Sequence, residues 1–371
     1  MLDTEHGGVN ESLLDAYQLS GDRKYLNAAK RFTHQTMLNG MQSLNTSFLD
    51  NRHANTQVPK YVGMARIGEQ DASATAYTTA AKNFWQDVVT NRTVCIGGNS
   101  MYEHFIAAGS SAVYIDNVDG PESCNTNNML KLTEMLSDET HDAQYADFYE
   151  YAMWNHILST QDPTTGGYVY FTTLRPQGYR IYSTVNESMW CCVGTGMENH
   201  SKYGHFVYTR DGKSKVYVNL FTASQLVSDD FVLTQATQFP YEPQTHITVG
   251  KAGTYTIAVR HPWWTTADFS IAVNGEVQTP SVTKGRHRMP NSAALGAKAT
   301  SSPSACRWNC ATPSVPTTTT TFRSSTAPSC WLPRPRPVRR PSLSRQDSPT
   351  KPCRTSTATR AAWTTHPAAA D

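Results

Sequence analysis

The sequence predicts an α+β protein with a helical first part, a β-rich second part and a basic tail of low complexity. Two periodicities and one change in composition indicate this class. Apolar residues recur at helical spacing up to residue 212, alternate with a period of two over 213–284, and follow neither period over 285–371. We therefore divide the 371-residue chain into these three regions.

The helical region contains three segments of similar design. Each has an amphipathic helix, a short break rich in Gly, Asp or Ser, and a second helix with Ala, Tyr and Phe at helical spacing. The segments are 13–32, 62–85 and 130–155. Repeated αα-hairpins are typical of a toroid whose units pack on their neighbours. A further helix is expected after Gly196, which would place Glu198 and His200 on its first turn and outside any site.

Polar side chains gather in the long loops between these hairpins. The loops read "RHANTQ" at 52–57, "GGNSMYEHF" at 97–105 and "GPESCNTNN" at 120–128. Functional sites are commonly built on loops that a rigid scaffold positions. We therefore expect the site to draw on these loops.

The second region has the alternation of half-buried strands. It covers "KVYVNLFTASQL", "HITVG", "TYTIAVRHPWW" and "FSIAVNGEVQ", and Asn274-Gly275 marks a tight hairpin turn. A β-sandwich is predicted to begin near residue 214 and to be cut short at about 284.

The tail differs sharply in composition from the rest. Residues 285–371 hold 13 of the 32 basic residues, 2 of the 30 acidic ones and 12 of the 20 prolines, with no Tyr, Ile or Glu. Such a segment buries too little apolar surface to offset its ordering entropy, so we predict a disordered tail. Its Arg, Pro, Ser, Thr and Ala richness suggests a GC-rich gene read out of frame after residue 284. The alternative is a genuine basic linker or nucleic-acid tail, which the lack of a folded basic module disfavours.

The cysteines of the first region raise a chemical question. Cys191 and Cys192 are adjacent, and neighbouring cysteines rarely form a disulfide with each other. Glu122 and Cys124 are two residues apart, so in extended backbone they point to one side. Together the four could bind zinc, which accepts thiolate and carboxylate ligands. From spacing alone, buried cysteines that act as small apolar side chains are an equally good reading.

Five motifs, in this order, resemble one enzyme family. They are "EHGGVNES…YQLSGDRKYLNAAKRF", "HANTQVPK", "IGGNSMYEHF", "ESCNTNNMLKLTEML" and "MWCCVGTGMENHSKYG". The sequence from about residue 3 to 280 resembles the retaining β-L-arabinofuranosidases of glycoside hydrolase family 127 and their relatives in family 146. The resemblance implies an (α/α)6 barrel followed by β-sandwich domains. Only about three hairpins and one further helix are counted here, so the barrel is expected to be partial.

The resemblance also implies roles for individual residues. Cys191 would be the nucleophile and Glu103 the general acid/base. A zinc ion would be bound by the set Glu122, Cys124, Cys191 and Cys192. His53, Tyr170 and His6 would contact the sugar, although a helix-capping or core histidine and a core aromatic are the plain alternatives.

The leading hypothesis is thus a zinc-dependent retaining glycosidase that releases terminal β-L-arabinofuranose, or a similar sugar, from plant-type glycans. Its partner would be an oligo- or polysaccharide. No apolar run reaches membrane-spanning length, so a membrane is not expected as a partner. Nucleic acid is not expected either, because the basic tail has no folded module or interleaved aromatic residues. Compartment and oligomeric state are left unassigned. A non-catalytic carbohydrate-binding remnant is the first alternative. A sugar isomerase or epimerase on a helical toroid is the second, and the thiol-rich zinc set argues against it.

Overall fold

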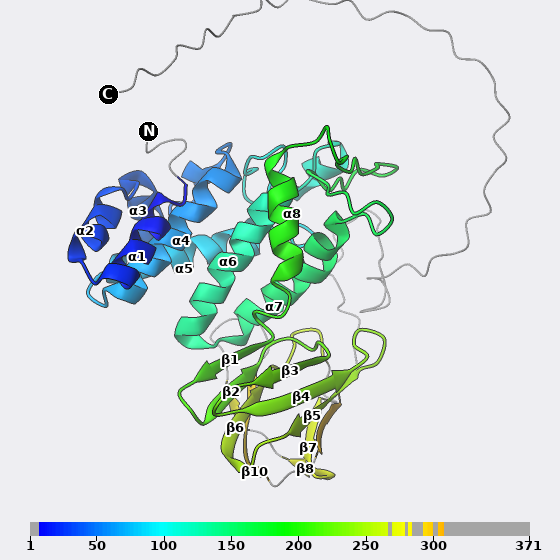
Figure 1. Cartoon of the computed structure of the whole chain (residues 1–371). Coiled ribbons are helices and arrows are strands. Elements are labelled where there is room, and N and C mark those ends of the chain that lie inside the picture. Colours follow the sequence, from blue (N-terminus) through cyan, green and yellow to red (C-terminus); the bar gives the residue numbers. More distant parts are fainter. Residues whose placement is uncertain (1–6, 266–268, 279–280, 284–291, 300–302, 308–371) are drawn as a thin grey trace, which may run out of the picture. The chain divides into compact units, whose positions relative to one another are not determined.

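A helical region followed by two β-sheets makes up the part of the chain that the structure describes (Figure 1). This computed structural model describes residues 7–265, 269–278, 281–283, 292–299 and 303–307. The helices are α1 (Val9–Ser20), α2 (Arg23–Arg31), α3 (Gln35–Gln42), α4 (Ala54–Gln70), α5 (Thr75–Asp87), α6 (Ser123–Thr140), α7 (Ala143–Ala152) and α8 (Cys191–Ser201). The three predicted hairpins are confirmed as the pairs α1–α2, α4–α5 and α6–α7.

Local sequence signals begin and end several of these helices. The Asp22 carboxylate caps α2 by accepting from the Lys24 amide, and Asp142 caps α7 by accepting from the Gln144 amide. Gly21 ends α1 at a left-handed φ of 70°, a conformation that favours glycine. The turns of the α1–α2 and α6–α7 pairs are therefore specified locally.

Burial of one face of each helix holds the region together. Helices α3 to α7 contribute to a single apolar cluster that includes Val58, Phe84 and Leu132, and the Tyr61 and Phe84 rings stack at 3.8 Å between centroids. Helices α1 and α2 close a smaller cluster around Leu14 and Leu26. Within the described residues, no helix is long and apolar enough to cross a membrane.

Two sheets follow the helices. Their strands are β1 (Tyr208–Asp211), β2 (Lys215–Val218), β3 (Ser224–Val227), β4 (Val232–Thr237), β5 (Gln244–Val249), β6 (Gly253–Val259), β7 (Ser270–Val273), β8 (Glu276–Gln278), β9 (Ser281–Thr283), β10 (Ser292–Ala299) and β11 (Pro303–Arg307). One sheet has the order β1-β2-β6-β10-β9 and the other β3-β4-β5-β11-β7-β8. Alternate residues of both sheets share one apolar cluster, which includes Val216, Leu233 and Ile257. The predicted turn at Asn274-Gly275 joins β7 to β8 with both residues at positive φ.

The sheets extend beyond the limits drawn from the sequence. Strand β1 precedes the predicted start at 213, and β10 and β11 follow the predicted end at 284. Strand β10 pairs with β6, and β11 inserts between β5 and β7. The remainder of the predicted tail, which is 285–291, 300–302 and 308–371, lies outside the described residues.

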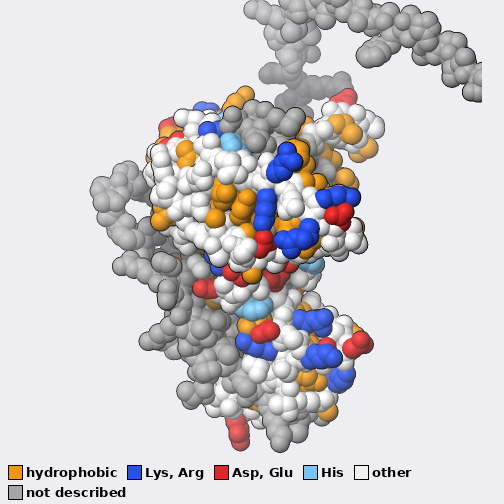
Figure 2. All heavy atoms as spheres, turned by 90° about the vertical axis from the view of Figure 1, so that its left-hand side faces the viewer, with side chains coloured by type: hydrophobic (Ala, Val, Ile, Leu, Met, Phe, Trp, Pro, Cys, Tyr) orange, Lys and Arg blue, Asp and Glu red, His pale blue; other side chains and the backbone are white. Residues whose placement is uncertain are grey.

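Charges of both signs are interleaved on the face shown in Figure 2, where Lys and Arg side chains lie beside Asp and Glu. Elsewhere in the helical region, Arg66 lies within ion-pair distance of three carboxylates, those of Glu11, Asp15 and Glu69. The Arg66 side chain is only 12 % exposed, whereas Asp15 and Glu69 are largely exposed.

One buried ion pair links the helices to the sheets. The Arg260 side chain, only 2 % exposed, donates to the Asp147 carboxylate on α7 at 2.6 Å and also to Glu150. Glu150 in turn accepts from the Trp264 indole N–H at 2.9 Å. Removing one partner of a buried pair leaves an uncompensated charge, at a typical cost of about 3–5 kcal/mol.

We therefore expect Arg260→Met to lower the free energy of unfolding by about 3 kcal/mol or more. Urea unfolding followed by circular dichroism measures the change. The matched control is Arg210→Met, because Arg210 is 60 % exposed and forms a 3.5 Å pair with Asp230. Equal, small effects of the two substitutions would contradict the prediction.

Candidate active site

The two adjacent cysteines begin α8. Cys191 and Cys192 are its first two residues, with Trp190 as the N-cap, so the expectation of a helix that starts after Gly196 is wrong. The two helical glycines explain the error, since glycine lowers helix propensity. Gly196 has a packing reason to be glycine, because a Cβ there would clash with the Tyr168 ring. The helix N-terminus favours a thiolate at Cys191.

The second pair of predicted ligands begins α6. Glu122 is the N-cap of this helix and Cys124 lies in its first turn. The structure brings both beside the α8 cysteines: the Cys124 and Cys192 sulfurs are 3.4 Å apart, and the Cys191 and Cys192 sulfurs 3.8 Å apart. The Cys191 sulfur lies 3.9 Å from a Glu122 carboxylate oxygen. One donor atom from each of the four residues lies within 4.8 Å of the others.

This donor set fits a tetrahedral metal ion. Zinc–sulfur bonds of about 2.3 Å place tetrahedral ligands about 3.8 Å apart, close to the sulfur separations of 3.4 and 3.8 Å here. The second Glu122 oxygen is buried without a hydrogen-bond partner, and burial followed by the nearby Cys191 charge raises the pKa of Glu122 to about 8. A cation among these groups would satisfy that oxygen and favour the carboxylate.

The four ligand candidates differ in access. Cys191 is exposed, whereas Glu122, Cys124 and Cys192 are buried. Hydrogen bonds from Cys124 and then Cys192 lower the pKa of the Cys191 thiol well below its ordinary value. Cys191 is thus the thiolate that a substrate can reach.

Other side chains hold this cluster in place, and sequence reasoning did not name them. The Asn55 amide donates to Glu122 at 3.3 Å, and Asn128 donates to Asn55 at 2.8 Å. The Thr195 hydroxyl lies 2.9 Å from the Cys124 sulfur. The available signal was the polar run of the predicted loops at 52–57 and 120–128, although the structure places Asn55 in α4 and Asn128 in α6.

Glu103 lies on a tight turn beside the cluster. Met101 and His104 exchange backbone hydrogen bonds of 2.9 and 3.0 Å, and Tyr102 and Glu103 between them have φ of 48° and 64°. Two non-glycine residues at positive φ are costly to hold, which is common at functional sites. The Glu103 carbonyl also accepts from the Ala54 amide at 2.7 Å, so the turn is fixed to the start of α4.

Tyr170 lies between Glu103 and Cys191. Its hydroxyl donates to the Glu103 carboxylate and also interacts with the Cys191 sulfur. Burial, followed by the Glu103 hydrogen bond, raises the pKa of Tyr170, so the hydroxyl stays protonated. It thereby connects the candidate acid/base to the candidate nucleophile.

His53 is a helix-capping residue, one of the interpretations that the sequence allowed. Its Nδ1 accepts from the Thr56 amide at 3.3 Å and caps α4, while its Nε2 lies 3.6 Å from the Glu103 carboxylate. Capping therefore aims the other ring nitrogen at the site. His6, the third predicted sugar contact, lies outside the described residues.

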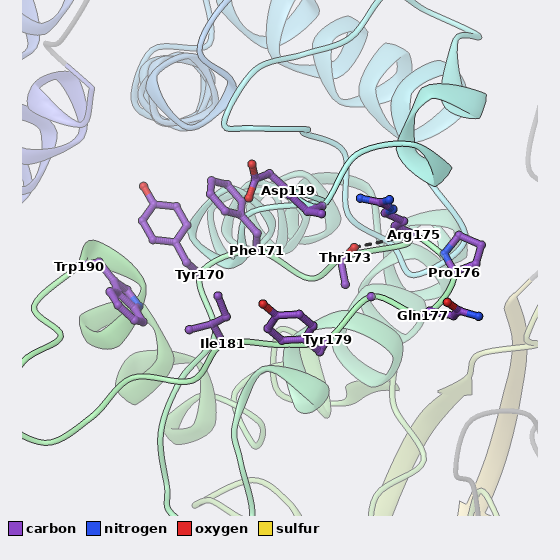
Figure 3. A pocket seen from close by; sticks show the side chains of 12 residues that line it. Asp119, Tyr170, Phe171, Thr173, Arg175, Pro176, Gln177, Tyr179, Ile181 and Trp190 are labelled. Carbon is purple, nitrogen blue, oxygen red and sulfur yellow. Dashed lines mark hydrogen bonds between the residues drawn. The ribbon is translucent and has the colours of Figure 1, made fainter. Parts of the chain in front are cut away.

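A cavity of about 520 Å³ adjoins this site (Figure 3). Tyr170 and Trp190 form one end of it, and Arg175 and Gln177 lie at the other. Trp190 directly precedes Cys191, and its ring centroid lies 6.2 Å from that of Tyr170. The cavity and the thiol cluster thus share a wall.

Comparison with protein families identifies the chain. A family model described as the catalytic domain of GH127 β-L-arabinofuranosidase matches residues 1–205, and the model of the GH127 middle domain matches residues 215–289. This chain belongs to the GH127 β-L-arabinofuranosidase family. The resemblance in the five sequence motifs is thereby confirmed. No curated protein matches the chain.

Solved structures share the fold of this GH127 member. One described as a glycoside hydrolase has a TM-score of 0.66 at 18% identity, covering 81% of this chain and 55% of that chain. A GH127 β-L-arabinofuranosidase from Geobacillus stearothermophilus T6 has a TM-score of 0.65 at 16% identity, covering 82% and 54%. The GH127 β-arabinofuranosidase BT3674 has a TM-score of 0.65 at 20% identity, covering 81% and 51%. The chain therefore spans about half the length of these proteins.

Proposed function

We propose that this chain carries the catalytic centre of a retaining glycosidase that releases terminal β-L-arabinofuranose, or a similar sugar, from plant-type glycans. The observation that carries the proposal is the exposed Cys191 within a four-residue donor cluster, joined to Glu103 through the Tyr170 hydroxyl. Membership of the GH127 family supports the substrate class. We further propose that the helices form part of an (α/α)6 barrel and that the two sheets form a β-sandwich.

The reaction has two steps in this proposal. The Cys191 thiolate attacks the anomeric carbon, and the bond to the glycosidic oxygen breaks as Glu103 protonates that oxygen. Glu103, now a carboxylate, then takes a proton from water, which attacks the anomeric carbon and releases Cys191 as thiolate. Each step inverts the anomeric centre, so the product retains its configuration.

Zinc is the metal we propose for Glu122, Cys124, Cys191 and Cys192. Bound there, it would hold the thiols deprotonated and make the Cys191 sulfur a better leaving group. Asn55 and Thr195 would orient two of its ligands, which outer-shell hydrogen bonds commonly do. His53 and Tyr170, and by resemblance His6, would contact the sugar.

Three measurements on the purified full chain test this function. Mass spectrometry should find about one zinc ion per chain. The chain should hydrolyse nitrophenyl β-L-arabinofuranoside, and NMR should show that the anomer formed first retains the configuration of the substrate. Sugar binding without turnover would instead support the non-catalytic alternative. An inverted product would contradict the two-step mechanism.

A separate prediction concerns Thr195. Thr195→Val keeps the shape of the side chain but removes the hydroxyl 2.9 Å from the Cys124 sulfur. We expect zinc affinity to fall by about 10–100-fold, the usual effect of losing an outer-shell partner. Competition with a chelating dye measures the affinity, and Thr195→Ser should restore most of it. Unchanged affinity in Thr195→Val would show that this hydroxyl does not orient the ligand.

A further inference from the structure

We propose that the cavity of Figure 3 binds the sugar residue on the leaving-group side of the scissile bond. The proposal rests on the proposed glycosidase function and adds a second substrate subsite to it. The cavity lies between the segment around Asp119 and the loop from Tyr170 to Ile181, with Trp190 at one end.

The position of Glu103 links the cavity to the chemistry. The residue before it, Tyr102, donates its backbone N–H to the Asp119 carbonyl at 3.2 Å, and its ring stacks 6.3 Å from Phe171. Asp119 and Phe171 both line the cavity. An acid must approach the leaving oxygen directly. The group attached to that oxygen therefore lies beside the Glu103 turn, and the lining residues Asp119, Phe171 and Tyr170 contact this turn.

The lining has the chemistry of a carbohydrate subsite. Aromatic faces from Phe171, Tyr179 and Trp190 suit the apolar C–H face of a sugar ring, and a few polar groups suit its hydroxyls. The Tyr179 ring is 78 % exposed, so it is accessible to a ligand in the cavity. A volume of about 520 Å³ is typical of small-molecule sites.

The polar groups favour a sugar over a proline-rich peptide as the occupant. Within the described part of the chain, the Asp119 carboxylate and the Arg175 guanidinium have no ion-pair or hydrogen-bond partner. A sugar hydroxyl can donate to Asp119 and accept from Arg175. A proline-rich segment lacks most of its backbone N–H groups, so it offers the Asp119 carboxylate fewer hydrogen-bond donors than a sugar does.

The test compares two substrates with the same terminal sugar. One is methyl β-L-arabinofuranoside, which has no second ring, and the other is a disaccharide that carries this sugar on a second arabinofuranose. The selectivity is the ratio of kcat/KM for the disaccharide to that for the methyl glycoside. Tyr179→Ala and Arg175→Ala in the full chain should each lower this ratio by about 10-fold or more, the scale of one lost contact in a specificity pocket. Tyr241→Ala is the matched control, because Tyr241 lies outside the cavity lining and is 77 % exposed.

An unchanged ratio in both variants would overturn the subsite. The subsite would also be overturned if the two variants lost kcat/KM only for arabinose linked to a hydroxyproline peptide. That result would make the peptide the occupant of the cavity. If the wild-type chain hydrolyses neither substrate, the proposed function fails instead. Binding of the disaccharide, measured by saturation-transfer NMR, then tests the subsite separately. Contacts between the protein and the second sugar ring that disappear in Tyr179→Ala would support the subsite. Absence of these contacts in the wild type would overturn it.

Discussion

Replacing Cys191 by serine should abolish glycoside turnover. Serine retains the size of the side chain, but its hydroxyl is not ionised near neutral pH and is a poor metal ligand. The substitution therefore removes the exposed thiolate at the start of α8 and one of four metal ligands at once. Loss of an enzyme nucleophile typically costs about 10⁶-fold in kcat. Initial rates with the nitrophenyl glycoside and zinc content per chain measure both consequences.

Two other cysteines serve as controls for that result. Cys95→Ser changes an exposed free thiol outside the cluster and should leave rate and zinc content as in the wild type. Cys192→Ser removes a buried ligand but leaves the nucleophile, so zinc content should fall while residual turnover still proceeds through Cys191. Turnover by Cys191→Ser above about one hundredth of the wild-type rate would contradict the assignment of the nucleophile.

Patterns within one segment could be predicted from the sequence, and contacts between segments mostly could not. The periods of the three hairpins and of strands β2, β5, β6 and β7 are local, so those elements were predicted. The pairing of β10 and β11 with β6 and β5 joins residues far apart in sequence, and the composition of 285–371 gave no sign of it. The contact between Thr195 and Cys124 spans 71 residues and likewise leaves no local pattern.

The Glu103 turn shows a second limit. Tight turns with two residues at positive φ usually contain Asn or Gly, yet Tyr102 and Glu103 stand there. Local propensity therefore opposes the turn, and the surrounding hydrogen bonds from Ala54 and to Asp119 hold it. Glu103 could be proposed only through the family resemblance. A residue held against its local preference beside a thiolate is consistent with a position selected for chemistry rather than for stability.

Replacing Glu103 by glutamine should lower the rate without disturbing the metal cluster. The amide oxygen of glutamine can still accept from the Tyr170 hydroxyl, so the turn and its neighbours should stay in place. Only proton transfer is lost, which typically costs about 10²–10⁴-fold. Zinc content should equal that of the wild type, and this separates Glu103 from the four ligand candidates.

The size of that loss should depend on the leaving group. A nitrophenolate departs without protonation, so the first step of Glu103→Gln should remain fast with the nitrophenyl glycoside, whereas the second step still lacks its base. The glycosyl-enzyme should then accumulate on Cys191. The test exposes Glu103→Gln briefly to this substrate and then applies intact-protein and peptide mass spectrometry, which should find one pentose attached at Cys191. An alkyl glycoside should give no such adduct, because its first step still needs the acid. An adduct that maps to a carboxylate would rule out the thiol as nucleophile, and an equal loss of rate for both leaving groups would show that Glu103 does not act as the acid.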